Sequence, residues 1–312
     1  MQYSKQETTV AILLFTAVIF GNALIFAIIP YLAKPEYGFG YHPFQIIMCM
    51  TGIALIGMLP WAKKQGIKGL ITGQKRVYLL RGVLEYGSFT LSFFSLSYVG
   101  EHFTLSMHTA LNYITPLLST IFSIWILKEK SHFYTWIALG IGIIGLLTIT
   151  RPGLIPASPG VLFVLGAALG FSLTGITIKL LTRTESSHHI AFYMLALSTL
   201  FALPMGILHW QTPNAEGWFW LIAIGVIAYL QQIYVAKAIS KVPYSLLIPI
   251  NFLQLIFVTA ISYLVYSVGI DRWTLLGTFI ILAGTIYNTN RTRAVATRNA
   301  TTEAAAIEAG IV

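Results

Sequence analysis

The chain has 312 residues, of which 56% are hydrophobic and only 9% are charged, and its mean hydropathy is +0.77. Because soluble domains carry about 25% charged residues, this composition excludes a soluble globular protein and indicates an integral membrane protein. The formal net charge of +9 does not indicate nucleic-acid binding, because membrane proteins gather Lys and Arg in their cytoplasmic loops.

Ten apolar segments follow one another along the chain, most of them close to the ~20 residues that cross a hydrocarbon layer as a helix. The sequence therefore predicts an all-α integral membrane protein with ten transmembrane helices. The predicted spans are 9–30, 43–61, 77–98, 103–127, 132–150, 158–181, 190–209, 217–238, 243–267 and 272–289. Residues 1–8 are predicted to form a cytoplasmic N-terminal tail, and residues 290–312 a disordered cytoplasmic C-terminal tail.

The basic residues predict how the spans are oriented. Fifteen of the 19 Lys and Arg residues fall at one set of span ends, and only Lys34, Arg151 and Arg272 fall at the opposite ends. Since Lys and Arg accumulate on the cytoplasmic side, both termini are expected inside the cell, which agrees with an even number of spans. The expected location is a bacterial inner membrane.

The two halves of the chain share a pattern. A span with an internal proline precedes a glycine-containing span around Pro116, and again around Pro249. We therefore divide the chain into a first repeat, 9–150, a linker, 151–157, and a second repeat, 158–289. Five spans per repeat is an odd number, so the repeats must be inverted, an arrangement found in transporters with a midplane binding site. The alternative is that Pro and Gly recur in the helices of any multi-span protein.

Glu85 is the sharpest candidate for a binding residue. It is the only one of ten acidic residues outside the tails, loops and span ends. At ~1.5 Å per residue it lies roughly 12 Å deep, where a charge costs at least ~2.5–3.5 kcal/mol. In the functional interpretation, Glu85 binds a cationic group of the substrate or exchanges a proton. In the structural interpretation, it is the partner of Arg81, four residues earlier on the same helix face. Arg81 lies closer to the cytoplasm and either snorkels to the surface, pairs with Glu85 or binds an anion.

A second group of candidate substrate-binding residues lies on spans 4 and 9. His108 and Asn112 are four residues apart and share a helix face beside Tyr113. Asn251 and Gln254 occupy the matching place in the second half. Polar groups at this depth either line a cavity or hydrogen-bond neighbouring helices, and His108 is also a candidate for proton coupling.

Motifs of other function classes are not found. No G-x-x-x-x-G-K-[ST] loop occurs, so the chain is not expected to use ATP. No Ser/His/Asp set or paired carboxylates indicate an enzyme, and no cofactor is expected. The pair His188-His189 lacks a Cys or carboxylate at ligand spacing, so no metal site is expected either.

Several motifs resemble the EamA-type branch of the drug/metabolite transporter superfamily, across residues 10–290. They are Leu80-Arg81-Gly82, Pro116 with Glu129, Arg151-Pro152-Gly153, Lys179, and the stretch from Pro249 to Asp271. The resemblance implies ten helices, an inverted repeat and transport of small organic metabolites. Within the family the chain is most similar to the bacterial branch of S-adenosylmethionine transporters and opine exporters.

The chain also departs from that branch at three positions. Met50 stands where an arginine is frequent, Val268 where a glutamate is frequent, and Gln254 where relatives can have an acid. All three are expected to face the pocket or a gate. The resemblance therefore indicates the fold more strongly than the substrate.

These observations predict a secondary transporter that works by alternating access around a cavity lined by spans 1, 3, 4, 6, 8 and 9. The expected substrate is a small metabolite, with S-adenosylmethionine or an amino-acid-like compound as candidates. The expected partners are this metabolite, the lipid bilayer and a second copy of the chain in a homodimer. The alternative is a polytopic membrane protein without transport activity, such as a lipid-processing or receptor-like subunit.

Overall fold

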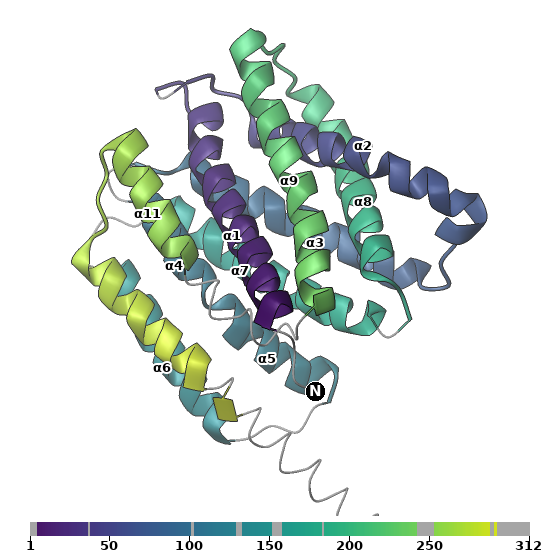
Figure 1. The fold of residues 1–312 in the computed structure, drawn as a ribbon. Helices are drawn as coiled ribbons and strands as arrows, with labels where there is room; N and C mark the ends of the chain where they lie inside the picture. The colour runs from purple at the N-terminus through teal and green to yellow at the C-terminus, as the bar shows by residue number, and fades with distance from the viewer. Residues whose placement is uncertain are drawn as a thin grey trace, which may run out of the picture.

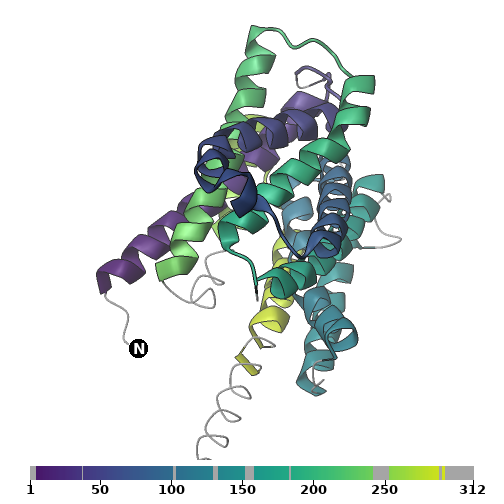
Figure 2. The ribbon, with the colours of Figure 1, turned by 90° about the vertical axis from the view of Figure 1, so that its right-hand side faces the viewer.

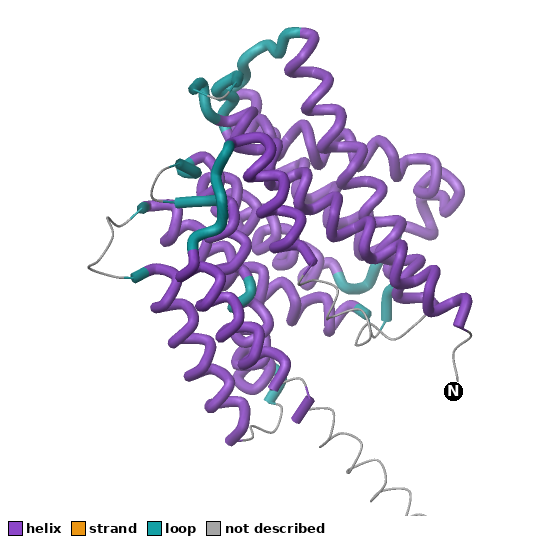
Figure 3. Tube along the Cα trace, turned by 60° about the vertical axis from the view of Figure 1, so that its left-hand side comes forward, coloured by secondary structure: helices purple, strands orange, loops and turns teal. Residues whose placement is uncertain are grey.

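The computed structural model describes residues 5–36, 38–100, 103–128, 133–151, 158–182, 184–241, 253–287 and 290–291. Figure 3 shows that the regular structure in these segments is helical, with no strand. The predicted all-α class is confirmed.

Each predicted span contains helical residues, although several bounds differ and residues 243–252 of the ninth span lie outside the described residues. In the first half the helices are α1 (Lys5–Ala33), α2 (Pro43–Leu70), α3 (Lys75–Ser97), α4 (Leu105–Asn112), α5 (Thr115–Ile126) and α6 (Phe133–Thr150). In the second half they are α7 (Pro159–Leu181), α8 (Ser187–Leu208), α9 (Ala215–Lys241), α11 (Leu253–Tyr266) and a last helix, Arg272–Tyr287.

The surface of the molecule is that of a membrane protein. Six helical stretches in the described residues are long and apolar enough to cross a bilayer, and less than half of each is buried inside the protein. Large apolar side chains such as Leu13, Trp125, Phe133, Leu162 and Leu264 are more than 60% exposed. Exposing this much apolar surface to water would be unfavourable, and it is expected where lipid covers the protein.

Span 4 differs from its prediction. The sequence predicts one helix over 103–127, but the helix ends at Asn112 and α5 begins at Thr115, with Pro116 in its first turn. Proline lacks an N–H and clashes with the preceding turn, so a break here and a restart with proline at the start cost less than a kinked continuous helix. Helices α1 and α2 also extend beyond their predicted ends, and α2 is kinked at Gly66 (φ 68°).

The two halves of the chain interlock. Helix α1 packs against α9, α2 against α8 and α9, and α3 against α7 and α8, as Figures 1 and 2 show. Each of these contacts joins a helix of the first half to one of the second. Their shared core includes fully buried Ile29, Ile46, Leu111, Val164 and Leu221. A space at the centre of this assembly is therefore walled by both halves.

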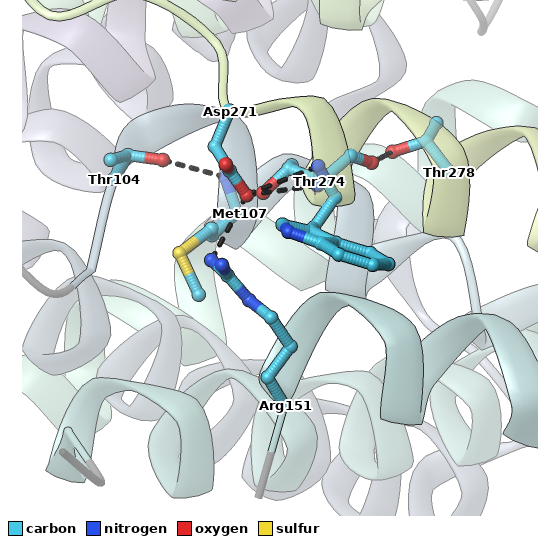
Figure 4. Close-up of polar contacts among 7 residues, drawn as sticks. Thr104, Met107, Arg151, Asp271, Thr274 and Thr278 are labelled. Atoms are coloured by element: carbon cyan, nitrogen blue, oxygen red, sulfur yellow. Dashed lines mark hydrogen bonds and ion pairs between the residues drawn. The ribbon is translucent and has the colours of Figure 1, made fainter. Parts of the chain in front are cut away.

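Helix α6 and the last helix lie side by side at one end of the bundle (Figure 1). They approach closely because both carry glycine at the contact: a Cβ on Gly145 would lie 2.7 Å from the carbonyl oxygen of Gly277. At the end of this pair, Arg151 Nη2 donates to Asp271 Oδ2 at 2.9 Å. Figure 4 shows that Asp271 also accepts the N–H of Thr274 and so caps the last helix. Both positions belong to motifs that carry the family resemblance, but the sequence does not predict this contact between the halves.

Candidate functional site

A cavity of about 490 Å³ lies between the two halves. Residues from α1, α2, α3, α4, α5, α7, α8, α9, α11 and the last helix line it. This set contains the predicted lining spans 1, 3, 4, 6, 8 and 9, and it adds spans 2, 7 and 10. The volume lies in the usual range for small-molecule sites, ~300–1,000 Å³.

Glu85 lines this cavity from α3, and Arg81 lies one turn behind it. Both residues are buried, with 7% and 4% of their surface exposed, and Arg81 Nη2 lies 3.6 Å from Glu85 Oε2. The pair forms as the i, i+4 spacing predicts, so Arg81 does not reach the surface. The separation exceeds hydrogen-bond length, and Arg81 Nε and Nη1 and Glu85 Oε2 make no hydrogen bond to the described residues. Glu85 Oε2 is sealed from solvent, so only Oε1 of this carboxyl group can face the cavity.

His108 stands behind the cavity wall in a directed hydrogen-bond chain. Ser95 Oγ donates to the carbonyl of Gly160 at 2.9 Å, so this oxygen must accept from His108 Nδ1 at 3.0 Å. His108 Nε2 is then the acceptor for Asn112 Nδ2 at 3.1 Å. Both ring nitrogens are occupied, since Ser92 Oγ also lies 3.4 Å from Nε2. This geometry favours the structural interpretation of His108 over proton coupling.

Asn112 presents its amide oxygen to the cavity. Its Nδ2 also donates to the carbonyl of His108 at 3.1 Å, so both amide hydrogens are used inside the wall. Asn112 is the last residue of α4, and its own carbonyl has no helical donor because residue i+4 is Pro116. The break in span 4 thus adds backbone polarity to the wall.

Tyr113 lines the cavity at this break and joins the halves. Its hydroxyl oxygen accepts the backbone N–H of Leu255 in α11 at 3.2 Å. Gln254, the neighbouring residue in α11, also lines the cavity, and so does Met50. Pro249 and Asn251 lie outside the described residues, and Val268 is not among the lining residues.

The structure thus brings four predicted site residues to the cavity surface: Glu85, Asn112, Tyr113 and Gln254. Arg81 and His108 act from behind it. Other lining residues carry no distinguishing signal in the sequence. They are the amides Asn22, Gln231 and Gln232 of α1 and α9, and the aromatic residues Phe26, Phe89, Phe93 and Phe171. Phenylalanine occurs in every predicted span, so only the packing distinguishes these four.

Within the described segments, no group of three or more His, Cys, Asp or Glu side chains is placed to hold a metal ion. The cavity offers instead one carboxylate, several amides and aromatic rings. Such a surface can bind an organic molecule that carries a cationic group and a planar ring.

The sequence matches known transporters along most of its length. The sequence model of the EamA-like transporter family matches residues 11–151 and, a second time, residues 158–290. The S-adenosylmethionine uptake transporter of Rickettsia prowazekii is 24% identical over 246 residues, or 79% of this chain and 82% of its own length. The riboflavin transporter of Vibrio cholerae is 30% identical over 247 residues, or 78% of this chain and 82% of its own.

A third relative, the pseudopaline exporter of Pseudomonas aeruginosa, is 25% identical and covers 77% of this chain and 79% of its own. A solved crystal structure of another protein has a TM-score of 0.61 and covers 91% of this chain and 98% of that chain. Its 18% identity makes this a likeness of fold alone. The two matches of the family model together span nearly all of the helical region, and the chain therefore belongs to the EamA-like transporter family.

Proposed function

We propose that this protein is a secondary carrier that moves a small organic metabolite across the membrane by alternating access. S-adenosylmethionine or an amino-acid-like compound is the first candidate substrate. The proposal draws on the family, whose named relatives here include an S-adenosylmethionine uptake transporter, a riboflavin transporter and a pseudopaline exporter. No enzymatic activity is part of it.

The observation that carries the proposal is the cavity with Glu85 in its wall. Glu85 Oε2 lies toward Arg81 and is sealed from solvent, which leaves Oε1 as the acceptor for a cationic group of the substrate. A sulfonium or ammonium group placed there would replace hydration with a fixed negative charge and hydrogen-bond acceptors. The aromatic rings around the cavity would cover the rest of the molecule.

We further propose that the halves are inverted five-helix repeats, residues 9–150 and 158–289, joined by residues 151–157, and that ten helices span the membrane. Two features support this. The family model matches twice in succession. The helix contacts also exchange when the halves are exchanged: α1 on α9 pairs the first and eighth spans, and α3 on α7 pairs the third and sixth. A rocking motion of such repeats about the cavity would provide alternating access.

The distribution of Lys and Arg supports a multi-pass protein of the bacterial inner membrane with both termini in the cytoplasm. The proposed partners are the lipid bilayer that surrounds the protein and a second copy of the chain in a homodimer. A multi-span protein without transport activity is the rival proposal. In that proposal Glu85 serves only as the structural partner of Arg81.

The test is transport by the full chain reconstituted into lipid vesicles. We expect saturable uptake of labelled S-adenosylmethionine, or exchange against an unlabelled internal pool. Glu85→Gln keeps the side-chain shape and removes the charge, so it should abolish this flux. The matched control is Glu36→Gln, which alters a glutamate whose side chain is 69% exposed in a loop and should leave the flux unchanged.

If Glu85→Gln does not fold, the double variant Arg81→Met/Glu85→Gln removes both charges and provides the same comparison. Normal flux in either folded variant would show that Glu85 does not bind the substrate. Absence of flux for S-adenosylmethionine, riboflavin and S-methylmethionine with the unaltered chain would remove the proposed substrate class.

A further inference from the structure

We propose that Asn22 of α1 and Gln231 of α9 form a hydrogen-bonding edge that recognises a planar nitrogen heterocycle, such as a nucleobase or a flavin ring. This inference rests on the proposed carrier function and specifies its substrate class. Both side chains line the central cavity and come from opposite halves of the chain. They are 209 residues apart in sequence and directly hydrogen-bonded.

The orientation of the two amides is determined by a backbone carbonyl. Gln231 Nε2 donates to the carbonyl of Val18 at 3.1 Å and to Asn22 Oδ1 at 2.9 Å. Because a carbonyl oxygen only accepts, the Gln231 atom beside Val18 must be the amide nitrogen. Both hydrogens of that nitrogen are then used, and Asn22 must turn its oxygen toward Gln231.

One donor group and one acceptor remain. Asn22 Nδ2 and Gln231 Oε1 make no hydrogen bond to the described residues, and neither belongs to the unpaired polar atoms that are sealed from solvent. Both are therefore accessible from the cavity that these residues line. An N–H donor beside a C=O acceptor is an edge that a ligand with the reverse pattern can satisfy.

The amide pair is held in place before any ligand arrives. A Cβ added to Gly21 would lie 3.0 Å from Gln231 Nε2, so the glycine allows α9 to bring this amide close to α1. The two hydrogen bonds of Gln231 then prevent rotation of its amide group. A rigid edge avoids the entropy loss of ordering side chains on binding, which increases affinity.

Planar nitrogen heterocycles carry the complementary edge. Adenine has an amino N–H donor beside ring nitrogen acceptors, and side-chain amides of Asn and Gln bind this edge in nucleic-acid complexes. A flavin ring has an imide N–H beside a carbonyl and matches the same donor and acceptor. Phe26 lines the cavity one turn from Asn22 on the same face of α1, where an aromatic ring can stack on the heterocycle.

The first experiment changes the ligand and leaves the protein unaltered. Adenosine and purine riboside differ only in the exocyclic amino group, which would donate to Gln231 Oε1. We would measure the Kd of both for the detergent-purified full chain by calorimetry. Because an unpaired buried acceptor is costly, we expect adenosine to bind about ten- to a hundredfold more tightly.

The second experiment adds the variant Gln231→Met, which removes the acceptor. The preference for adenosine should then be lost, because its amino group no longer finds the Gln231 acceptor. The matched control is Gln65→Met at an exposed glutamine of α2 outside the cavity, which should preserve the preference for adenosine. The comparison in the unaltered chain remains decisive if Gln231→Met does not fold.

Equal affinities in the unaltered chain would overturn the inference, and so would an undiminished preference in Gln231→Met. Binding of S-methylmethionine without binding of adenosine or riboflavin would also overturn it while leaving the carrier proposal standing. S-methylmethionine shares the sulfonium and amino-acid groups of S-adenosylmethionine but has no ring. The carrier proposal is tested separately by flux in vesicles.

Discussion

The buried pair Arg81–Glu85 provides a prediction about stability that the structure specifies quantitatively. Both side chains are more than 90% buried, and the charged atoms are 3.6 Å apart. At an effective dielectric constant of about 20, charges at this distance attract by roughly 4–5 kcal/mol. Arg81→Met removes this attraction and leaves a buried carboxylate without a partner, which costs about 3–5 kcal/mol of unfolding free energy.

Removing both charges should behave differently. The pair lacks good hydrogen bonds, since Arg81 Nε and Nη1 have no partner in the described segments. Its attraction is therefore offset by the cost of dehydrating two charges. A double Met variant loses none of the described hydrogen bonds, and the volume lost at Arg81 is partly regained at Glu85. We expect Arg81→Met/Glu85→Met to have a stability within about 1 kcal/mol of the unaltered chain or above it.

Thermal unfolding of the detergent-solubilised chain measures these effects. At ~2 °C per kcal/mol for a chain of this size, Arg81→Met should lower Tm by about 6–10 °C, and the double variant should restore it. The pair Lys34–Glu36 has the same 3.6 Å separation but exposes 69% of the Glu36 side chain, so Glu36→Gln should shift Tm by less than about 2 °C. A double variant as unstable as Arg81→Met would show that the loss comes from packing, and would refute the electrostatic argument.

Two further predictions concern packing and pH. Gly145→Ala places a methyl group 2.7 Å from the backbone oxygen of Gly277, so it should cost about 1–3 kcal/mol, whereas Gly140→Ala has nothing within 4 Å and should be neutral or stabilising. Equal Tm values for the two variants would contradict the close contact. Burial and the neighbouring His209 lower the pKa of His42, just before α2. The unfolded chain then binds the proton more readily, so stability should fall as pH drops through about 6.5, and His42→Gln should flatten this dependence of Tm on pH.

Much of the fold could be predicted from the sequence because it is encoded locally. The length and hydropathy of each segment predict a helix in lipid, and the spacing of Arg81 and Glu85 predicts an ion pair within one helix. The break in span 4 was not predicted, since the sequence predicts one helix over 103–127. Pro116 interrupts the backbone hydrogen bonds of the helix. Whether it kinks the helix or begins a new one depends on which neighbouring groups can bond to the backbone groups left without helical partners. Here the hydroxyl of Tyr113 bonds to α11 at the break.

The candidate site could be predicted less well. His108 and Asn112 share a helix face, yet only Asn112 lines the cavity, because Ser95 of α3 and Gly160 of α7 engage the histidine from behind. Asn22 and Gln231 had no local signal, since single amides in apolar helices are equally common as contacts between helices.

The sequence by itself determined the membrane class and the order of the helices. Those properties follow from composition and from a rise of ~1.5 Å per residue. Only the tertiary structure decided which side chains meet at the cavity. The rotation of each helix about its own axis relative to its neighbours is set by contacts between residues far apart in the chain, such as Val18 with Gln231 and Tyr113 with Leu255.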